Sequence, residues 1–165
     1  MKVELKSFKM VEEMSEETNC FYAKLYINGK CVGDCENRGH GGSTDYHISD
    51  SAIRTAFEAY AKGLPPVTSD IPGHDPFTYN MDAETLIDQL VEEQLKKKDE
   101  KRLQRLAKNE KKKNDAKGYP VTVQITFEDQ VLWFGCKDKG NINSFVEKMK
   151  EKHKISAVSK VEIIA

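Results

Sequence analysis

A β-hairpin is the strongest local constraint that this sequence places on its fold. Four apolar side chains alternate with polar ones immediately before an Asn-Gly pair: Phe21, Ala23, Leu25 and Ile27 before Asn28-Gly29. Such alternation is typical of a strand with one buried face, and Asn-Gly accepts the positive φ angles of a type I′ turn. With a two-residue turn, we expect Leu25 to lie opposite Val32 and Tyr22 opposite Cys35.

The segments around this hairpin predict one further strand and a helix. In residues 2–11 the apolar positions alternate and then change phase after Leu5, as they do at a β-bulge. A helix is expected from Ser49 or Asp50 to Lys62. Its apolar stripe has helical spacing and consists of Ile53, Phe57, Tyr60 and Leu64. Residues 1–64 are therefore predicted to form a βββα unit with a glycine-rich loop.

The last third of the chain predicts a second unit with the order ββαβ. Alternating apolar residues lie on both sides of a short turn at Asp129-Gln130, so that Phe127 would face Leu132. Trp133 would then lie on the opposite, exposed face. A helix follows Gly140 and Asn141, and a final strand runs to about residue 163. This unit is expected over residues 119–165.

Between the two units we expect a connector over residues 65–80 and a long helix over residues 81–118. The connector is rich in proline and glycine, which interrupt regular structure. Asn80 or Asp82 can cap the helix, whose apolar stripe ends near Leu95. The fold class is therefore predicted as α+β: two small antiparallel-sheet-plus-helix units joined by a long charged helix.

The second half of this helix carries most of the charge asymmetry of the chain. The 165 residues have a net charge of −1, yet residues 96–117 contain eleven basic and four acidic residues. That segment therefore carries a net charge of +7, and the remainder of the chain carries a net charge of −8. Such a helix can be a solvated face or a binding surface for an acidic protein or a polyanion. The residues predicted to bind a partner are Lys97, Lys98, Lys101, Arg102, Arg105, Lys108 and Lys112.

The partner predicted for this helix is a host protein. Nucleic acid remains open as an alternative, although the interspersed acids and the pI of about 6.4 argue against a dedicated nucleic-acid binder. A homodimer also remains open. No membrane partner is expected, because no apolar stretch approaches the ~18 residues that a span requires.

A glycine-rich loop before the first helix is the best candidate for a ligand site. Consecutive glycines allow a ligand to approach the backbone, and N–H groups ahead of a helix can bind an anion. The loop lacks the spacing of a dinucleotide-binding or P-loop motif, so it can equally be a turn with a helix cap. The residues predicted to bind a nucleotide or another anion are Arg38, Gly39, His40, Gly41, Gly42, Ser43, Thr44 and Asp45.

A metal-dependent hydrolase is a further alternative, through His40, Asp45, His47 and His74. Their spacing is irregular and matches no zinc motif, so no metal ligand, cofactor or catalytic residue is assigned, and the chain is expected not to be an enzyme. The four cysteines lack a tight spacing, which predicts free thiols in a reducing compartment. Because the N-terminus has no apolar leader, we expect a cytoplasmic protein.

Three segments of the first third of the chain resemble a known group of proteins. They are Ser15-Glu16-Glu17-Thr18, the strand Phe21-Tyr22-Ala23-Lys24-Leu25-Tyr26-Ile27-Asn28-Gly29-Lys30, and Asn37-Arg38-Gly39-His40-Gly41-Gly42. This pattern resembles uncharacterised small proteins of bacteriophages and bacterial mobile elements. The resemblance implies an accessory protein that binds and inhibits a host defence or metabolic protein. A non-enzymatic binding protein of this kind is the function that the sequence predicts.

Overall fold

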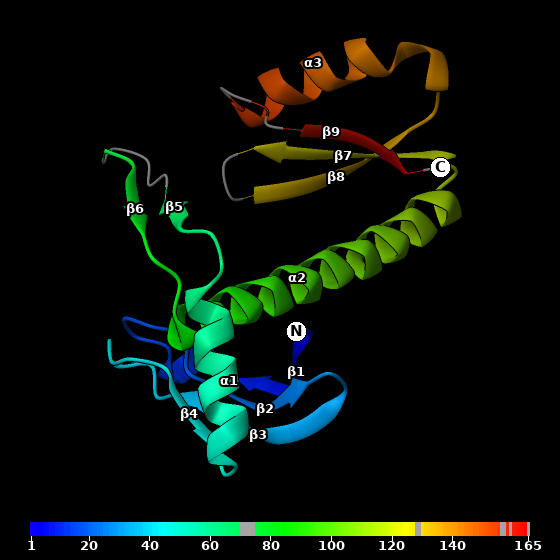
Figure 1. Cartoon of the computed structure of the whole chain (residues 1–165). Helices are drawn as coiled ribbons and strands as arrows, with labels where there is room; N and C mark the ends of the chain where they lie inside the picture. Colours follow the sequence, from blue (N-terminus) through cyan, green and yellow to red (C-terminus); the bar gives the residue numbers. More distant parts are fainter. Residues whose placement is uncertain (70–74, 128–129, 156–157, 159, 165) are drawn as a thin grey trace. The chain divides into compact units, whose positions relative to one another are not determined.

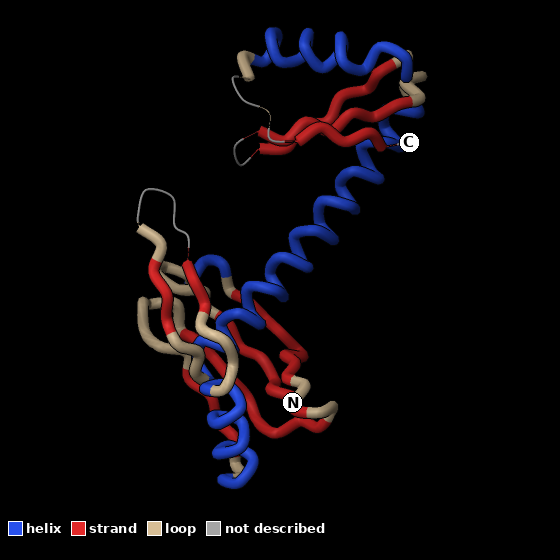
Figure 2. Tube along the Cα trace, turned by 45° about the horizontal axis from the view of Figure 1, so that its top comes forward, coloured by secondary structure: helices blue, strands red, loops and turns tan. Residues whose placement is uncertain are grey.

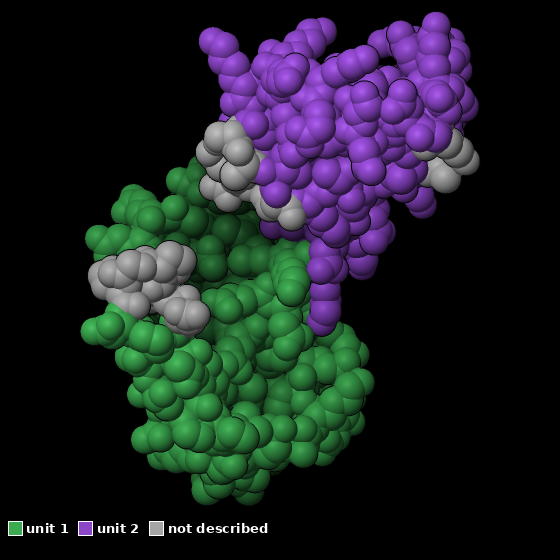
Figure 3. Space-filling model, turned by 90° about the horizontal axis from the view of Figure 1, so that it is seen from above, with its two compact units in different colours: residues 1–96 green, residues 97–165 purple. Residues whose placement is uncertain are grey.

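The structure, a computed structural model, describes residues 1–69, 75–127, 130–155, 158 and 160–164. In this part of the chain three antiparallel sheets and three α-helices confirm the predicted α+β class (Figure 1). Two compact units, residues 1–96 and residues 97–165, divide the chain, and helix α2 (Ala83–Ala116) contributes to both (Figure 3).

Unit 1, residues 1–96, is built on a four-stranded antiparallel sheet (Figure 2). The strands are β1 (Val3–Met10), β2 (Phe21–Ile27), β3 (Lys30–Asn37) and β4 (Asp45–Ile48), in that order. The first half of α2 and helix α1 (Ser51–Lys62) pack on one sheet face. Leu25, Phe57 and Ile87 are fully buried between them. The Asp50 carboxylate caps α1 by accepting from the N–H groups of Ala52 and Ile53.

The predicted hairpin is present, but a β-bulge shifts its register by one residue from the predicted one. Asn28 and Gly29 have φ angles of 50° and 83°, which confirms the turn. Leu25 pairs with Gly33 rather than with Val32, and Tyr22 with Glu36 rather than with Cys35. The bulge takes Asp34 and Glu36 off the core face and turns Cys35 and Asn37 inward; a regular ladder would have buried both acids.

Three short strands were not predicted from the sequence. β4 pairs with β3 and completes the sheet, so unit 1 has four strands where three were expected. In the expected connector, β5 (Val67–Ser69) pairs with β6 (Phe77–Tyr79), and the hydroxyls of Thr68 and Thr78 lie 3.0 Å apart. Strands of three or four residues are too short for alternation to distinguish them from loops.

Unit 2, residues 97–165, contains a three-stranded sheet with the order β8-β7-β9. Its strands are β7 (Val121–Phe127), β8 (Gln130–Cys136) and β9 (Lys160–Ile164). Helix α3 (Ile142–His153) covers one face, where Val121, Val123 and Ile125 are fully buried. The second half of α2 covers the other face, where the amide of Asn114 donates to the hydroxyl of Thr122 at 3.0 Å.

The second hairpin differs from the predicted register by two residues. Leu132 pairs with Ile125, while Phe127 pairs with Gln130. A shift of two residues leaves every side chain on the face that was predicted for it. Asp129 of the expected turn lies outside the described residues, and Gln130 begins β8. Trp133 is on the predicted face but is half-buried rather than exposed, and its indole N–H donates to Gln124 at 3.1 Å.

Candidate functional site

The second half of α2 presents its basic residues away from the sheet on which it packs. Ala107 is 9% exposed and marks the side of the helix that faces the sheet. At about 100° per residue, the seven basic residues predicted to bind a partner fall within an arc of about 140° opposite Ala107. We call this set the basic stripe; all seven members are exposed: Lys97, Lys98, Lys101, Arg102, Arg105, Lys108 and Lys112. From its first to its last residue it extends over about 22 Å of helix.

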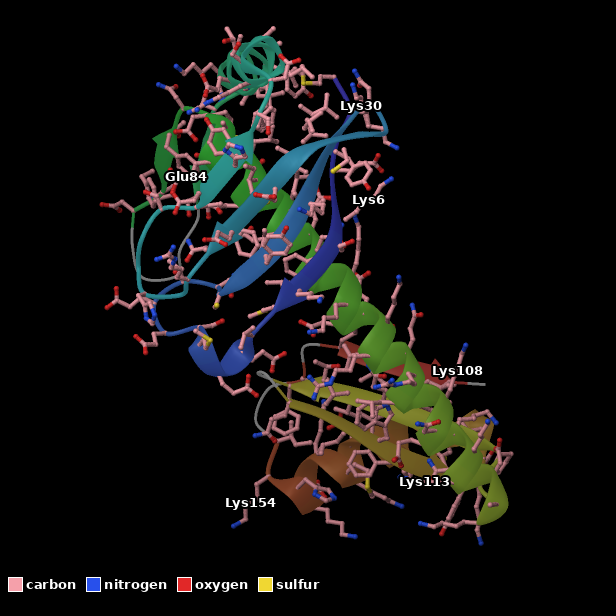
Figure 4. All side chains as sticks on the ribbon, turned by 90° about the horizontal axis from the view of Figure 1, so that it is seen from below. Lys6, Lys30, Glu84, Lys108, Lys113 and Lys154 are labelled. Carbon is pink, nitrogen blue, oxygen red and sulfur yellow. The ribbon has the colours of Figure 1, made fainter. Side chains whose placement is uncertain are left out.

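The acids of the same helix segment neutralise little of this stripe. Asp115 pairs with Lys111 at 2.7 Å and Glu110 pairs with Lys113 at 2.6 Å, and neither lysine belongs to the stripe. Lys97 and Lys98 are engaged in interactions. Among the residues that the structure describes, no ion pair involves the five others, namely Lys101, Arg102, Arg105, Lys108 and Lys112. Lys108 and Lys113, labelled in Figure 4, come from this part of α2.

The charge asymmetry follows the division into units. Residues 1–96 carry nine basic and 17 acidic residues, a net charge of −8. Residues 97–165 carry 17 basic and 10 acidic residues, a net charge of +7. The seven stripe residues account for all of this positive charge, because the rest of unit 2 carries ten basic and ten acidic residues. The positive potential of unit 2 is therefore that of the stripe.

The glycine-rich loop of unit 1 is held by one backbone carbonyl. The carbonyl oxygen of Gly39 accepts from the N–H groups of Glu16, Glu17 and Thr18 at 3.0, 3.0 and 3.3 Å. Gly39 has a φ of 88°, and a Cβ at this position would collide with the carbonyl oxygen of Met14. Only glycine meets both requirements. The fold therefore accounts for glycine at position 39, and no ligand is needed to explain it.

Asn37 organises the same loop through its side chain and was not singled out from the sequence. Its Oδ1 accepts from the N–H of Gly39 at 2.9 Å and from the hydroxyl of Thr18 at 2.8 Å. Its Nδ2 donates to the carbonyl of Gly42 at 2.9 Å and to the Thr44 hydroxyl at 3.3 Å. An asparagine before a glycine-rich turn is the signal that could have identified it.

Three carboxylates of α2 face this loop across a pocket of about 380 Å³. Glu84, Asp88 and Glu92 recur at a spacing of four residues and therefore share one side of the helix. The N–H of Thr44 donates to Glu84 at 3.0 Å, and its hydroxyl donates to Asp88 at 2.6 Å. Desolvation by burial and then the charge of Glu84 raise the pKa of Asp88 above its ordinary value. The helical spacing of the three carboxylates can be recognised in the sequence, but their position opposite the glycine-rich loop cannot.

The residues that were predicted to bind an anion are distributed over two separate pockets. Gly41, Gly42, Ser43 and Thr44 line the pocket with the three carboxylates. Arg38, His40 and Asp45 line a second hollow of about 380 Å³, together with Gly42 and Ser43. Among the lining residues of the first pocket there is no lysine, arginine or histidine, and the carboxylates repel an anion placed there. Nucleotide binding at this loop stays a prediction.

Two of the four candidate metal ligands, His40 and His47, are engaged with other partners. His40 lies 3.1 Å from a carboxylate oxygen of Glu16, and His47 lies 3.3 Å from the hydroxyl of Ser49. His74 lies outside the described residues. Within the described part of the chain, no group of three or more His, Cys, Asp or Glu residues is placed to hold a metal ion.

The four cysteines, Cys20, Cys31, Cys35 and Cys136, are free thiols, as expected. Cys31 is exposed and the other three are buried; burial raises the pKa of Cys35 to about 12. No helix in the described residues is long and apolar enough to span a bilayer.

Comparisons of this chain with models of protein families, with curated proteins and with solved structures find no match. The resemblance to phage and mobile-element proteins therefore stays a prediction. The geometry and the charge of the chain itself are what can support a function.

Proposed function

We propose that this protein is a non-enzymatic binding protein that holds an acidic surface of another protein against the basic stripe of α2. The observation that carries this proposal is the position of the stripe. Seven exposed cations follow one side of a helix whose opposite side is anchored to its own sheet. A rigid row of cations is preorganised to meet a complementary row of carboxylates and to accelerate encounter with it.

The position of Trp133 favours a protein over nucleic acid as the partner. Nucleic-acid grooves commonly pair cations with aromatic stacking surfaces. Trp133 lies on the sheet and is hydrogen-bonded to Gln124, so it offers no such surface beside the stripe.

The resemblance to phage and mobile-element proteins supports a host protein as the partner, and inhibition of a host defence or metabolic component as the outcome. The free thiols are in keeping with a reducing, cytoplasmic setting for this encounter. A host protein that exposes an acidic surface in that compartment is therefore the partner that we propose.

Neutralising the stripe tests the proposal. The stripe variant combines Lys101→Gln, Arg105→Gln, Lys108→Gln and Lys112→Gln; glutamine has nearly the helix propensity of lysine and arginine, so the helix is retained. The matched control removes four other exposed lysines of unit 2 by Lys117→Gln, Lys137→Gln, Lys148→Gln and Lys152→Gln. Both variants lose four positive charges, and only their positions differ.

The assay measures binding of fluorescein-labelled polyglutamate by anisotropy over a salt series, alongside a duplex DNA of equal charge. We expect the stripe variant to lose at least tenfold in polyglutamate affinity and most of its salt dependence, while the control retains both. Host proteins captured by wild type and control should be missing with the stripe variant. Equal loss in both variants, or a preference for DNA over polyglutamate, would overturn the proposal.

A further inference from the structure

The cations of the basic stripe follow the spacing of a heptad repeat. Five of them are separated alternately by three and four residues, which is the spacing of the a and d positions. We call these five exposed residues the cationic seam: Lys98, Lys101, Arg105, Lys108 and Lys112. At about 100° per residue they lie within an arc of about 80°. Because α2 is one unbroken helix here (Figure 1), the seam is a nearly straight row about 21 Å long.

The acids of the same segment avoid the positions that a second helix would contact. In a pair of helices the a, d, e and g positions face the partner, whereas b, c and f face away. From Lys97 to Lys112 the a, d, e and g positions hold eight basic residues, one glutamine and one asparagine. The three acids of this range lie at b, c and f: Asp99, Glu100 and Glu110. Ala107, on the side facing the sheet, is at c. The next d position is Asp115, which pairs with Lys111 and ends the seam.

We propose that the partner presents its acids on an α-helix that packs along the cationic seam. This inference rests on the proposed function, which makes an acidic protein surface the occupant of the stripe. The seam spaces its cations about 5 Å apart along the helix axis, and carboxylates at the a and d positions of a second helix have the same period. The seam covers about four helical turns, so the partner helix needs about 15 residues with an acid at every third or fourth position.

An extended segment fits the seam less well than a helix does. Side chains on one face of a strand are about 7 Å apart, against about 5 Å between successive cations of the seam. After three steps the strand is ahead by about one whole cation, so its carboxylates pair with only part of the row. A helix stays in step over the full length, and the aliphatic stems of the lysines and arginine then cover its surface.

A second copy of this chain is the less suitable source of the acidic helix. Two cationic seams placed against each other are rows of like charge and repel one another. The acids in the first half of α2, Glu84, Asp88 and Glu92, recur at every fourth residue, so they do not have the alternating spacing of the seam. Glu84 and Asp88 also accept hydrogen bonds from Thr44 of the glycine-rich loop. The acidic helix is therefore assigned to another protein.

The test uses three fluorescein-labelled, alanine-rich peptides of three heptads, each with six glutamates. The seam peptide has its glutamates at the a and d positions. The split peptide has them at a and c, which places three on each of two opposite sides of the helix. A hydrocarbon staple between two f positions holds both helical. The broken peptide is the seam peptide without the staple and with two central alanines replaced by proline, which prevents the helix. Circular dichroism verifies the three conformations.

Anisotropy titrations compare wild type, the stripe variant and its matched four-lysine control. We expect wild type and control to bind the seam peptide about tenfold more tightly than the split or the broken peptide, because six rather than three carboxylates reach the cations. The stripe variant should lose this preference.

Equal affinity of wild type for the seam and split peptides, or for the seam and broken peptides, overturns a helical partner. So does a dimer in light scattering that the stripe variant dissociates, because a second copy would then occupy the seam. A stripe variant that binds the seam peptide as tightly as wild type overturns the proposed function instead.

Discussion

Replacing Asn37 by alanine should destabilise unit 1 by about 2–4 kcal/mol, because its side chain makes four hydrogen bonds from a buried position. The N–H of Gly39 is buried and would be left unsatisfied, which costs about 1–3 kcal/mol. Thr18 is half-buried and Gly42 is exposed, so both can turn to water, and each of these two lost bonds costs about 0.5 kcal/mol.

Native-state hydrogen exchange measures this effect within unit 1. The slowest amides of β2 and β3, which exchange through global unfolding, should exchange roughly 30 to 1,000 times faster in Asn37→Ala than in wild type. The matched control is Asn19→Ala: Asn19 is exposed and has no hydrogen bond to a described residue, so its loss should change stability by less than about 0.5 kcal/mol. Similar exchange in Asn37→Ala and wild type, or an equal effect of Asn19→Ala, would refute the assigned role of Asn37.

Three further predictions concern the same unit. Because the folded protein raises the pKa of Asp88, stability should fall as pH rises from the ordinary carboxyl pKa through the raised one; Asp88→Asn should flatten this dependence in urea titrations and increase stability at pH 7. A thiol-reactive disulfide reagent at pH 8 should label Cys31 quickly and Cys35 only after unfolding, so Cys31→Ser should remove the fast phase. Gly39→Ala should cost at least about 3 kcal/mol in the same titrations, since a positive φ and a steric collision coincide there.

The elements that could be predicted from the sequence are those long enough to show a period. The turn at Asn28-Gly29, α1 and the long helix follow from local spacing, and the structure confirms them. The register of the first hairpin could not be predicted, because the bulge is favoured by removing Asp34 and Glu36 from the core, and the core is a property of the whole unit.

The same distinction applies to the candidate site. The basic stripe is periodic within one helix, so its residues could be named from the sequence, while its orientation depends on the side of α2 that packs on the sheet. The carboxylates opposite the glycine-rich loop could not be assigned to it. Thr44 is separated from Glu84 by 40 residues and from Asp88 by 44, and no local pattern connects them.

The three N–H groups that converge on the carbonyl of Gly39 make residues 16–18 and the glycine-rich loop a single piece. Grafting this loop onto another scaffold therefore requires transfer of both segments, together with Asn37, whose side chain connects them. Either one transplanted alone would lose the shape for which it was chosen.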